Sequence, residues 1–167
     1  MTRVTIGDRE SHQWHTVMKV ELLKQAYLTG KRNFSHSHLQ RVRLHKAHLP
    51  DINLSDAYLN RAILNKANLE RAYLNRAILY AANLDRANLY RASVIEANLE
   101  KSNLSHAILN HANLSGANFK NANLQHAQLV WANLRSANFR NANLEGVNFT
   151  GARFDQTIMP DGSIKNS

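Results

Sequence analysis

The sequence predicts an all-β solenoid, a parallel β-helix with a short α-helix covering its N-terminal end. Two observations predict it, and both concern a repeat of five residues. First, 24 of the 25 positions at five-residue steps from Phe34 to Phe154 hold Leu or Phe, and Val94 is the exception. Second, Ala stands two residues before 19 of these positions, and Asn fills the position between in 14 repeats.

A five-residue period excludes an α-helix. Such a step rotates a helix by about 140°, which would spread the leucines over every face. In an extended chain, residues two apart share a face, so Ala and the following Leu point into one core. Because five is odd, the chain must bend once per repeat to keep that face inward. The bent strands then close into coils that stack in parallel about 4.8 Å apart, and right-handed winding follows the usual crossover preference.

The repeat occupies residues 32–156 and leaves a segment on each side. A stack of coils exposes core and strand edges at both ends, so we expect residues 1–31 and 157–167 to form caps. The N-terminal segment has apolar residues at helical spacing, and Gly30 follows as a terminator. The expected apolar stripe consists of Trp14, Val17, Met18, Leu22 and Ala26, widened by Leu23, Tyr27 and Leu28. At the other end, Ile158, Met159 and Ile164 are expected to cover the last coil.

Composition and charge limit the classes of function. The 167 residues include no Cys, which excludes a disulfide framework, thiol catalysis and Cys-ligated zinc. No signal peptide or membrane span is evident, so a cytoplasmic protein without membrane association is expected. The formal net charge is +9, of which residues 1–101 contribute +7. Nucleic-acid or anionic-partner binding by this basic half is therefore an alternative function. The charge and the types of outward residue change near Val94, which indicates either a fusion of two segments or drift within one array.

The Ala-Asn-Leu register resembles the pentapeptide-repeat family across residues 32–156. The resemblance implies a right-handed quadrilateral β-helix with four repeats in each coil, so that residues 20 apart lie above one another. The start at Gly30-Lys31-Arg32-Asn33-Phe34 and the finish at Met159-Pro160-Asp161-Gly162 resemble cyanobacterial members, one of which is linked to heterocyst differentiation. Some members protect gyrase by imitating DNA. That role requires an acidic rod and is not expected of a basic chain.

Outward-facing side chains are the candidates for a functional site. The residue two after each Leu should lie at a corner, and the many Lys and Arg there are expected to encircle the rod without forming a stripe. Exposed apolar patches usually mark interaction sites, particularly when aromatic residues and Arg occur together. The first candidate patch consists of Tyr58, Tyr73, Ile78, Tyr80, Ile95, Arg61 and Arg76. The second consists of Tyr90, Ile108, Val130 and Trp131. The alternative interpretation is that these residues are scattered β-formers on a solvated sheet.

The sequence gives no reason to expect catalysis. Nine His residues are present, with His106 and His126 expected on adjacent coils, but carboxylates are too scarce beside them to predict a metal site. Nucleophile, zincin and phosphate-loop motifs are absent, and Leu side chains fill the tube. We therefore expect a non-catalytic scaffold or protein-interaction module with no cofactor. A protein is the favoured partner, ahead of nucleic acid.

Overall fold

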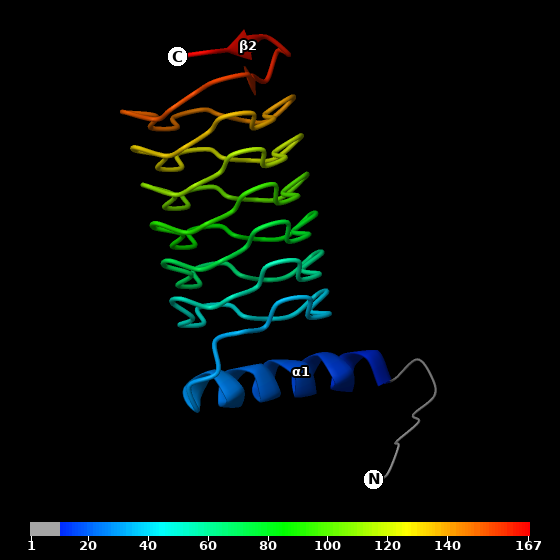
Figure 1. Cartoon of the computed structure of the whole chain (residues 1–167). Helices are drawn as coiled ribbons and strands as arrows, with labels where there is room; N and C mark the ends of the chain where they lie inside the picture. The colour runs from blue at the N-terminus through cyan, green and yellow to red at the C-terminus, as the bar shows by residue number, and fades with distance from the viewer. Residues whose placement is uncertain (1–10) are drawn as a thin grey trace.

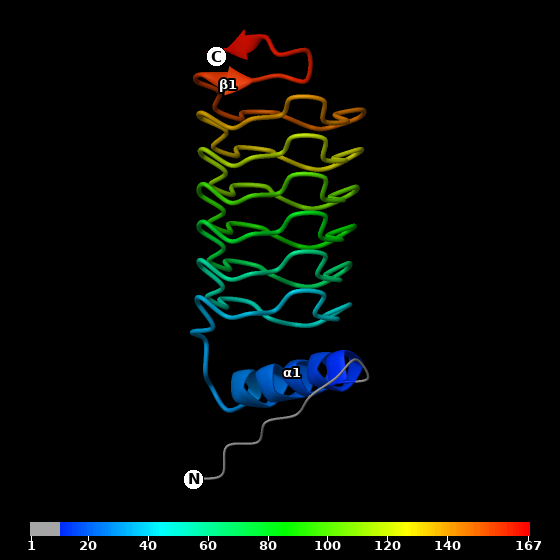
Figure 2. The same cartoon turned by 90° about the vertical axis from the view of Figure 1, so that its right-hand side faces the viewer.

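The computed structural model describes the backbone of residues 11–167 and the side chains of residues 20–167. Helix α1 (Ser11–Leu28) lies across one end of a stack of coils (Figure 1). Strands β1 (Thr157–Ile158) and β2 (Ile164–Lys165) form an antiparallel pair at the other end. A view turned by 90° shows the same level coils above α1 (Figure 2). The chain therefore forms a solenoid with different structures at its two ends.

Parallel pairing fixes the number of repeats in each coil. Bridges join residues 20 apart along the whole array, from Asn33–Asn53 to Asn138–Ile158. Four five-residue repeats therefore make one coil, which gives the rod four faces, as the family resemblance implied. The bridging residue is the one between Ala and Leu, and backbone hydrogen bonds on both sides of it join neighbouring coils. For example, the Leu39 N–H donates to the Tyr58 carbonyl at 2.8 Å.

Leu and Ala fill the interior, which confirms the inward assignment. From residue 54 to residue 89, every Leu and Ala at these positions is at most 2% exposed. Burying a Leu side chain contributes about 2 kcal/mol relative to leaving it in water. The bulkier Ile52 is also fully buried at an Ala position. Towards the C-terminal end Phe replaces Leu, and the rings of Phe119 and Phe139 stack with centroids 4.8 Å apart.

Every corner of the rod is a tight turn with a left-handed residue. The N–H of Ala57 donates to the Leu54 carbonyl at 3.1 Å, and this bond recurs along the array. The residue two after Leu has a positive φ in all 25 repeats, yet only three of these residues are Gly. A positive φ at the second central residue defines a type II turn. The corner position was predicted, but its left-handed backbone was not, because Gly is scarce there.

Helix α1 ends in a Schellman motif. The N–H groups of Gly30 and Lys31 donate to the carbonyls of Tyr27 and Ala26 at 3.0 and 2.9 Å. Gly30 adopts a φ of 97°, which favours glycine. The predicted role of Gly30 as the helix terminator is therefore confirmed.

The apolar stripe of α1 differs from the expected one. Val20, Leu23 and Tyr27 are buried in the same cluster as the coil leucines. Leu22 and Leu28 are 63% and 82% exposed, so their assignment to the buried stripe was wrong. The reason is geometric: spacings of three and four residues place positions 20, 23 and 27 on one helix face. Ala26 is partly buried, while the side chains of Trp14, Val17 and Met18 lie outside the described residues.

The coil extends one repeat beyond the expected boundary at Gln156. Ile158 bridges Asn138, and the Asn141 N–H donates to the Pro160 carbonyl at 3.0 Å, as at other corners. Met159 packs against the core as expected. Ile158 occupies the outward position of its repeat, and Ile164 pairs with it in the antiparallel register and is 51% exposed. These two isoleucines therefore do not cover the open core, because cross-strand partners point to the same side.

Candidate interaction surface

The outward positions form four columns, which we call faces A, B, C and D in the order in which the chain passes through them from His38 onward. Each face is defined by its bridging residues at 20-residue steps. Face A begins at His38, face B at Arg43, face C at His48 and face D at Asn33. The two residues after each Leu or Phe lie at the corner between successive faces.

The first candidate patch is centred on face A. Tyr58 bridges Ile78 in the next coil and is 40% exposed. The His38 ring stacks on the Tyr58 ring, with centroids 4.7 Å apart and planes at 5°. Tyr80 follows at the A–B corner, one coil beyond the corner that holds Arg61. The structure therefore brings Tyr58, Ile78 and Tyr80 together and adds His38, which the sequence prediction missed.

The remaining residues of the first patch lie around the neighbouring edge. Tyr73 is 51% exposed on face D, between Asn53 and Ser93 in the adjacent coils. Arg76 and Ile95 occupy the D–A corner of successive coils. The first patch therefore wraps around an edge of the rod and does not form one plane.

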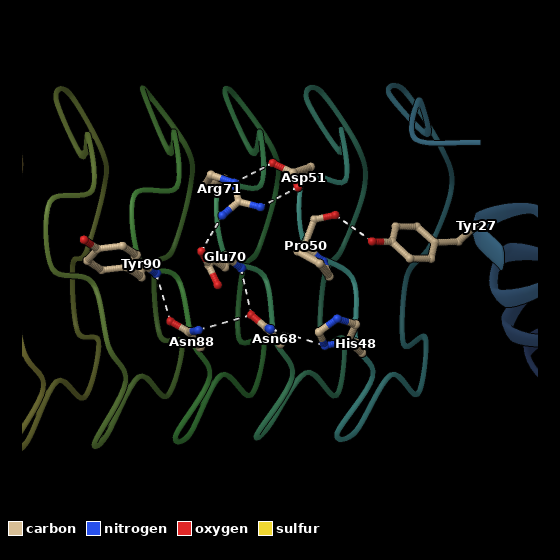
Figure 3. Close-up of polar contacts among 9 residues, drawn as sticks. All are labelled: Tyr27, His48, Pro50, Asp51, Asn68, Glu70, Arg71, Asn88 and Tyr90. Atoms are coloured by element: carbon tan, nitrogen blue, oxygen red, sulfur yellow. Dashed lines mark hydrogen bonds and ion pairs between the residues drawn. The ribbon is translucent and has the colours of Figure 1, made fainter. Parts of the chain in front are cut away.

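Ion pairs link successive coils at the corners that border face D. Both Asp51 oxygens accept hydrogen bonds from Arg71 at 2.8 Å (Figure 3). The Arg76 guanidinium donates to Asp56 in the same way, at 2.8 and 2.9 Å. These hydrogen bonds lower the pKa of each carboxyl below its usual 3.8 and raise the pKa of each guanidinium. Arg76, a member of the first patch, is therefore neutralised by its own scaffold.

The second candidate patch follows the C–D corner over three coils. Tyr90 and Val130 share one corner column, and Ile108 is 40% exposed on the adjoining face C. Trp131 is 59% exposed, and its indole packs closely against the Gly151 corner of the next coil. A shallow groove of about 340 Å³ lies beside this Trp. The groove is lined by His111, Ala112, Asn113, Trp131, Asn133 and Arg153.

The outward Asn residues stabilise the turns. The side-chain oxygen of each of the 14 bridging Asn accepts the N–H of the residue two positions later. Amides also bond between coils: Asn88 donates to Asn68 at 3.2 Å, and Asn68 contacts His48 at 3.3 Å (Figure 3). Asn at this position completes the hydrogen bonding of the backbone.

Lys and Arg occupy all four corners of the rod, as expected, but Lys46, Lys66 and Arg86 form a stripe along the B–C corner, which was not expected. Because residues 20 apart stack, every charged side chain from 41 to 156 lies around either face B or face D. Face B and its two corners carry nine cations and three carboxylates, whereas face D and its two corners carry five of each. One side of the rod is strongly basic, and the opposite side is neutral overall.

The described residues show no arrangement suited to a metal ion or a membrane. His106 and His126 stack as expected, with ring centroids 5.2 Å apart. No group of three or more His, Cys, Asp or Glu in the described part of the chain is placed to hold a metal ion. The helix found within residues 11–167 lacks the length and apolar character needed to cross a membrane.

Comparisons with known proteins agree with this fold. A trypsin-treated variant of QnrB1, a plasmid-mediated fluoroquinolone resistance protein, has a TM-score of 0.71 at 18% identity, over 77% of this chain and 66% of that chain. Rfr23 from the cyanobacterium Cyanothece 51142 is 30% identical over 83% of this chain and 99% of its own, with a TM-score of 0.41. HetL, involved in heterocyst differentiation regulation in Nostoc sp. strain PCC 7120, is 27% identical over 87% and 99%, with a TM-score of 0.30.

Of these three similarities, the one to QnrB1 bears on structure, and it shows the fold alone. The chain spans just under two thirds of the length of that protein. No curated protein matches the sequence. The family model for pentapeptide repeats, whose members are typically non-catalytic scaffolds or interaction modules, matches 8 copies over residues 52–91, 97–135 and 127–160. The chain therefore belongs to the pentapeptide-repeat family.

Proposed function

We propose that this chain is a non-catalytic scaffold that binds a protein partner through the first candidate patch. In this proposal the rod is a right-handed quadrilateral β-helix that acts in the cytoplasm, with α1 as its N-terminal cap and residues 162–167, which follow the last repeat, as its C-terminal cap. The observation that carries the proposal is the outward-facing run of Tyr58, Ile78 and Tyr80 on adjacent coils, in which Tyr58 is exposed and the other two are partly buried. Contiguous apolar surface of this kind typically marks an interaction site.

The construction of the rod supports binding rather than catalysis. Ala and Leu fill the interior, so the rod presents its chemistry on the outer columns. Hydrogen bonds between coils hold the backbone that carries Tyr58 and Ile78, which reduces the entropy lost when a partner binds. Tyr and Arg are also the residues most often found at energetic hot spots of protein interfaces. Arg61, exposed at the A–B corner, supplies the cation at the rim of the patch.

Affinity capture from the source cell tests the proposal. The bait is the full chain, compared with a Tyr58→Ala/Ile78→Ala/Tyr80→Ala variant. A matched variant, Ile108→Ala/Val130→Ala/Trp131→Ala, removes three outward apolar residues from the second patch. We expect a partner that binds the wild-type chain and the matched variant but binds the first variant at least tenfold more weakly. Thermal unfolding should show that both variants remain folded, because the substituted side chains point outward.

Equal binding by the wild-type chain and the first variant would remove the first patch from the proposal. Loss of the partner only from the matched variant would assign binding to the second patch instead. Either result leaves the fold intact and contradicts the proposed site.

A further inference from the structure

The net positive charge of residues 41–156 lies on one side of the rod. We use the name basic face for face B together with its two corners. Its nine cations are Arg41, Arg43, Lys46, Arg61, Lys66, Arg86, Lys101, Lys120 and Arg140. With three carboxylates, this side has a net charge of +6, whereas the side around face D has a net charge of zero. Five of the six net positive charges lie between Arg41 and Lys66, in the first two coils, and Lys120 supplies the sixth. In the other coils each carboxylate offsets one cation of the same coil.

The cations of the basic face are arranged in straight columns. Lys46, Lys66 and Arg86 stack at 20-residue steps along the B–C corner, and all three are exposed. His106 and His126 continue the same column. Coils are spaced by about 4.8 Å, so the backbone positions that carry neighbouring cations of a column are about 4.8 Å apart. A second column consists of Arg41, Arg61 and Lys101. It follows the A–B corner, on the other edge of face B.

Carboxylates neutralise the opposite side more effectively than the basic face. Around face D, Asp51 and Asp56 each bind one guanidinium through two hydrogen bonds. On the basic face, the contact between Asp85 and Arg86 is longer, at 3.8 Å, and Glu145 accepts a hydrogen bond from the neutral amide of Gln125. Most cations of the basic face are therefore available to a ligand.

We propose that the basic face binds duplex nucleic acid through its phosphates, without reading sequence. A duplex is a straight polyanion with one charge per about 1.7 Å, and it suits straight columns of Lys and Arg. A single strand is a poorer fit because Tyr80 is the only Phe, Tyr or Trp that residues 40–146 place on the basic face, which leaves no row of rings on which successive bases could stack. An acidic peptide would need apolar anchors or a free strand edge. Face B offers only Ile63 as an outward apolar residue, and its strands are already paired.

This surface overlaps the first candidate patch at the A–B corner, where Arg61 and Tyr80 lie, but its B–C corner column does not belong to that patch. The B–C corner column and Tyr80 lie on opposite sides of face B. Tyr58 lies farther from this column, on face A. Substitutions in that column therefore leave the first candidate patch unchanged, and the two proposals can fail independently.

Fluorescence anisotropy of a labelled 20-base-pair duplex tests the inference. The full chain is titrated at several salt concentrations from 50 mM upward. A net charge of +6 predicts that log K falls with log salt with a slope of about −5. The variant Lys46→Gln/Lys66→Gln/Arg86→Gln should reduce this slope to about −2.5, because each phosphate contact contributes about −0.9.

The matched control removes the same amount of charge from the opposite side. Arg91, Arg135 and Arg153 are exposed around face D, and their joint replacement by Gln should change the slope by less than about one unit. Circular dichroism confirms that both variants fold. Equal losses in the two variants would mean that net charge alone attracts the duplex, which overturns the proposed face. Absence of binding at 50 mM salt overturns it too, as does tighter binding of a single strand, polyglutamate or anionic vesicles.

Discussion

At the residue scale, every backbone N–H of a typical five-residue unit has a hydrogen-bond acceptor. In such a unit, the N–H groups of the bridging residue, of Leu and of the residue two after Leu donate to backbone carbonyls of neighbouring coils. The Ala N–H donates to the carbonyl of the preceding Leu and closes the turn. The fifth N–H belongs to the residue directly after Leu, and it donates to the side-chain oxygen of the bridging Asn. Where Ser93 replaces the bridging Asn, Asn75 of the preceding coil accepts the Ile95 N–H at 3.1 Å instead. The abundance of Asn therefore follows from the turn and not from a binding site.

Asn118→Ala tests this role. The Asn118 oxygen accepts the Lys120 N–H at 3.1 Å, and its amide donates to Asn98 at 3.3 Å. Losing these bonds should lower the free energy of unfolding by about 1 kcal/mol, measured by urea denaturation. Asn65→Ala is the control, because this outward Asn follows Leu and does not occupy the bridging position. Its effect should stay below about 0.5 kcal/mol. Equal destabilisation by both substitutions would refute the assigned role of the bridging Asn.

Left-handed corners provide a second prediction at this scale. Ala81 has a φ of 54°, whereas its neighbour Ala82 is buried at 1% exposure. Ala81→Gly should raise stability by about 0.5 kcal/mol, because glycine adopts this conformation without strain. Ala82→Gly should lower it by about 1 kcal/mol through lost burial and greater freedom of the unfolded chain. Thermal unfolding measures both changes, and effects of the same sign would contradict the strain at the corner.

At the element scale, a few directed contacts attach α1 to the coils. The Tyr27 hydroxyl donates to the Pro50 carbonyl at 2.6 Å (Figure 3). The Arg32 guanidinium lies 3.9 Å from the centroid of the Tyr27 ring. Tyr27 therefore joins the last turn of the helix to the first coils, and the end of α1 must be well defined for this contact to form.

Gly30→Ala should weaken the end of α1. A Cβ at this position meets nothing within 4 Å, so only the φ of 97° opposes the substitution. We expect a loss of about 1 kcal/mol in the free energy of unfolding. Urea denaturation followed by circular dichroism measures this loss. An unchanged midpoint would show that Gly30 does not need the left-handed conformation.

The ion pairs between coils predict a pH dependence. The pKa values of Asp51 and Asp56 are lowered by hydrogen bonds from Arg71 and Arg76, so folding favours the ionised carboxylates. Their stabilising effect is present above the unfolded value of 3.8 and is lost as the pH falls through the lower folded pKa. Because these pairs are exposed, the effect should be small and should weaken with salt.

Comparison with an Asp51→Asn/Asp56→Asn variant isolates this effect from other carboxyl groups. Urea midpoints are measured at pH 5 and pH 2 for both proteins. The wild-type chain should lose more stability across this interval than the variant does. The same loss in both proteins would show that the two ion pairs contribute nothing.

At the scale of the whole molecule, the repeat predicted the architecture because the period constrains every residue in it. The inward positions of Leu and Ala follow from alternation along an extended chain, and the 20-residue coil follows from the family resemblance. The conformation of the corners escaped prediction because residues as different as Arg61 and Trp131 adopt it. In these turns the pairing between coils overrides local preference.

The ends were harder to predict because the period does not extend to them. Leu22 and Leu28 fit an amphipathic pattern, but the contact with the coil is made by a different face of α1. Thr157 looked like the end of the repeat, yet it is buried at an Ala position, where its hydroxyl donates to the Leu134 carbonyl at 2.7 Å. The candidate patches could be assembled from the 20-residue register. The basic face could be found from the sequence only by placing every charged residue in the same register.

Both proposed surfaces depend on that register, so a distance test of it is the most direct measurement. The chain has no Cys, and pairs can therefore be introduced without background. Asn103 and Asn123 bridge adjacent coils, whereas Asn118 lies on another face. Mild oxidation should form a disulfide in Asn103→Cys/Asn123→Cys, since neighbouring strands lie within disulfide reach, and should form none in Asn103→Cys/Asn118→Cys. Equal cross-linking of both pairs, or cross-linking only at the 15-residue spacing, would contradict the four-repeat coil and the surfaces built on it.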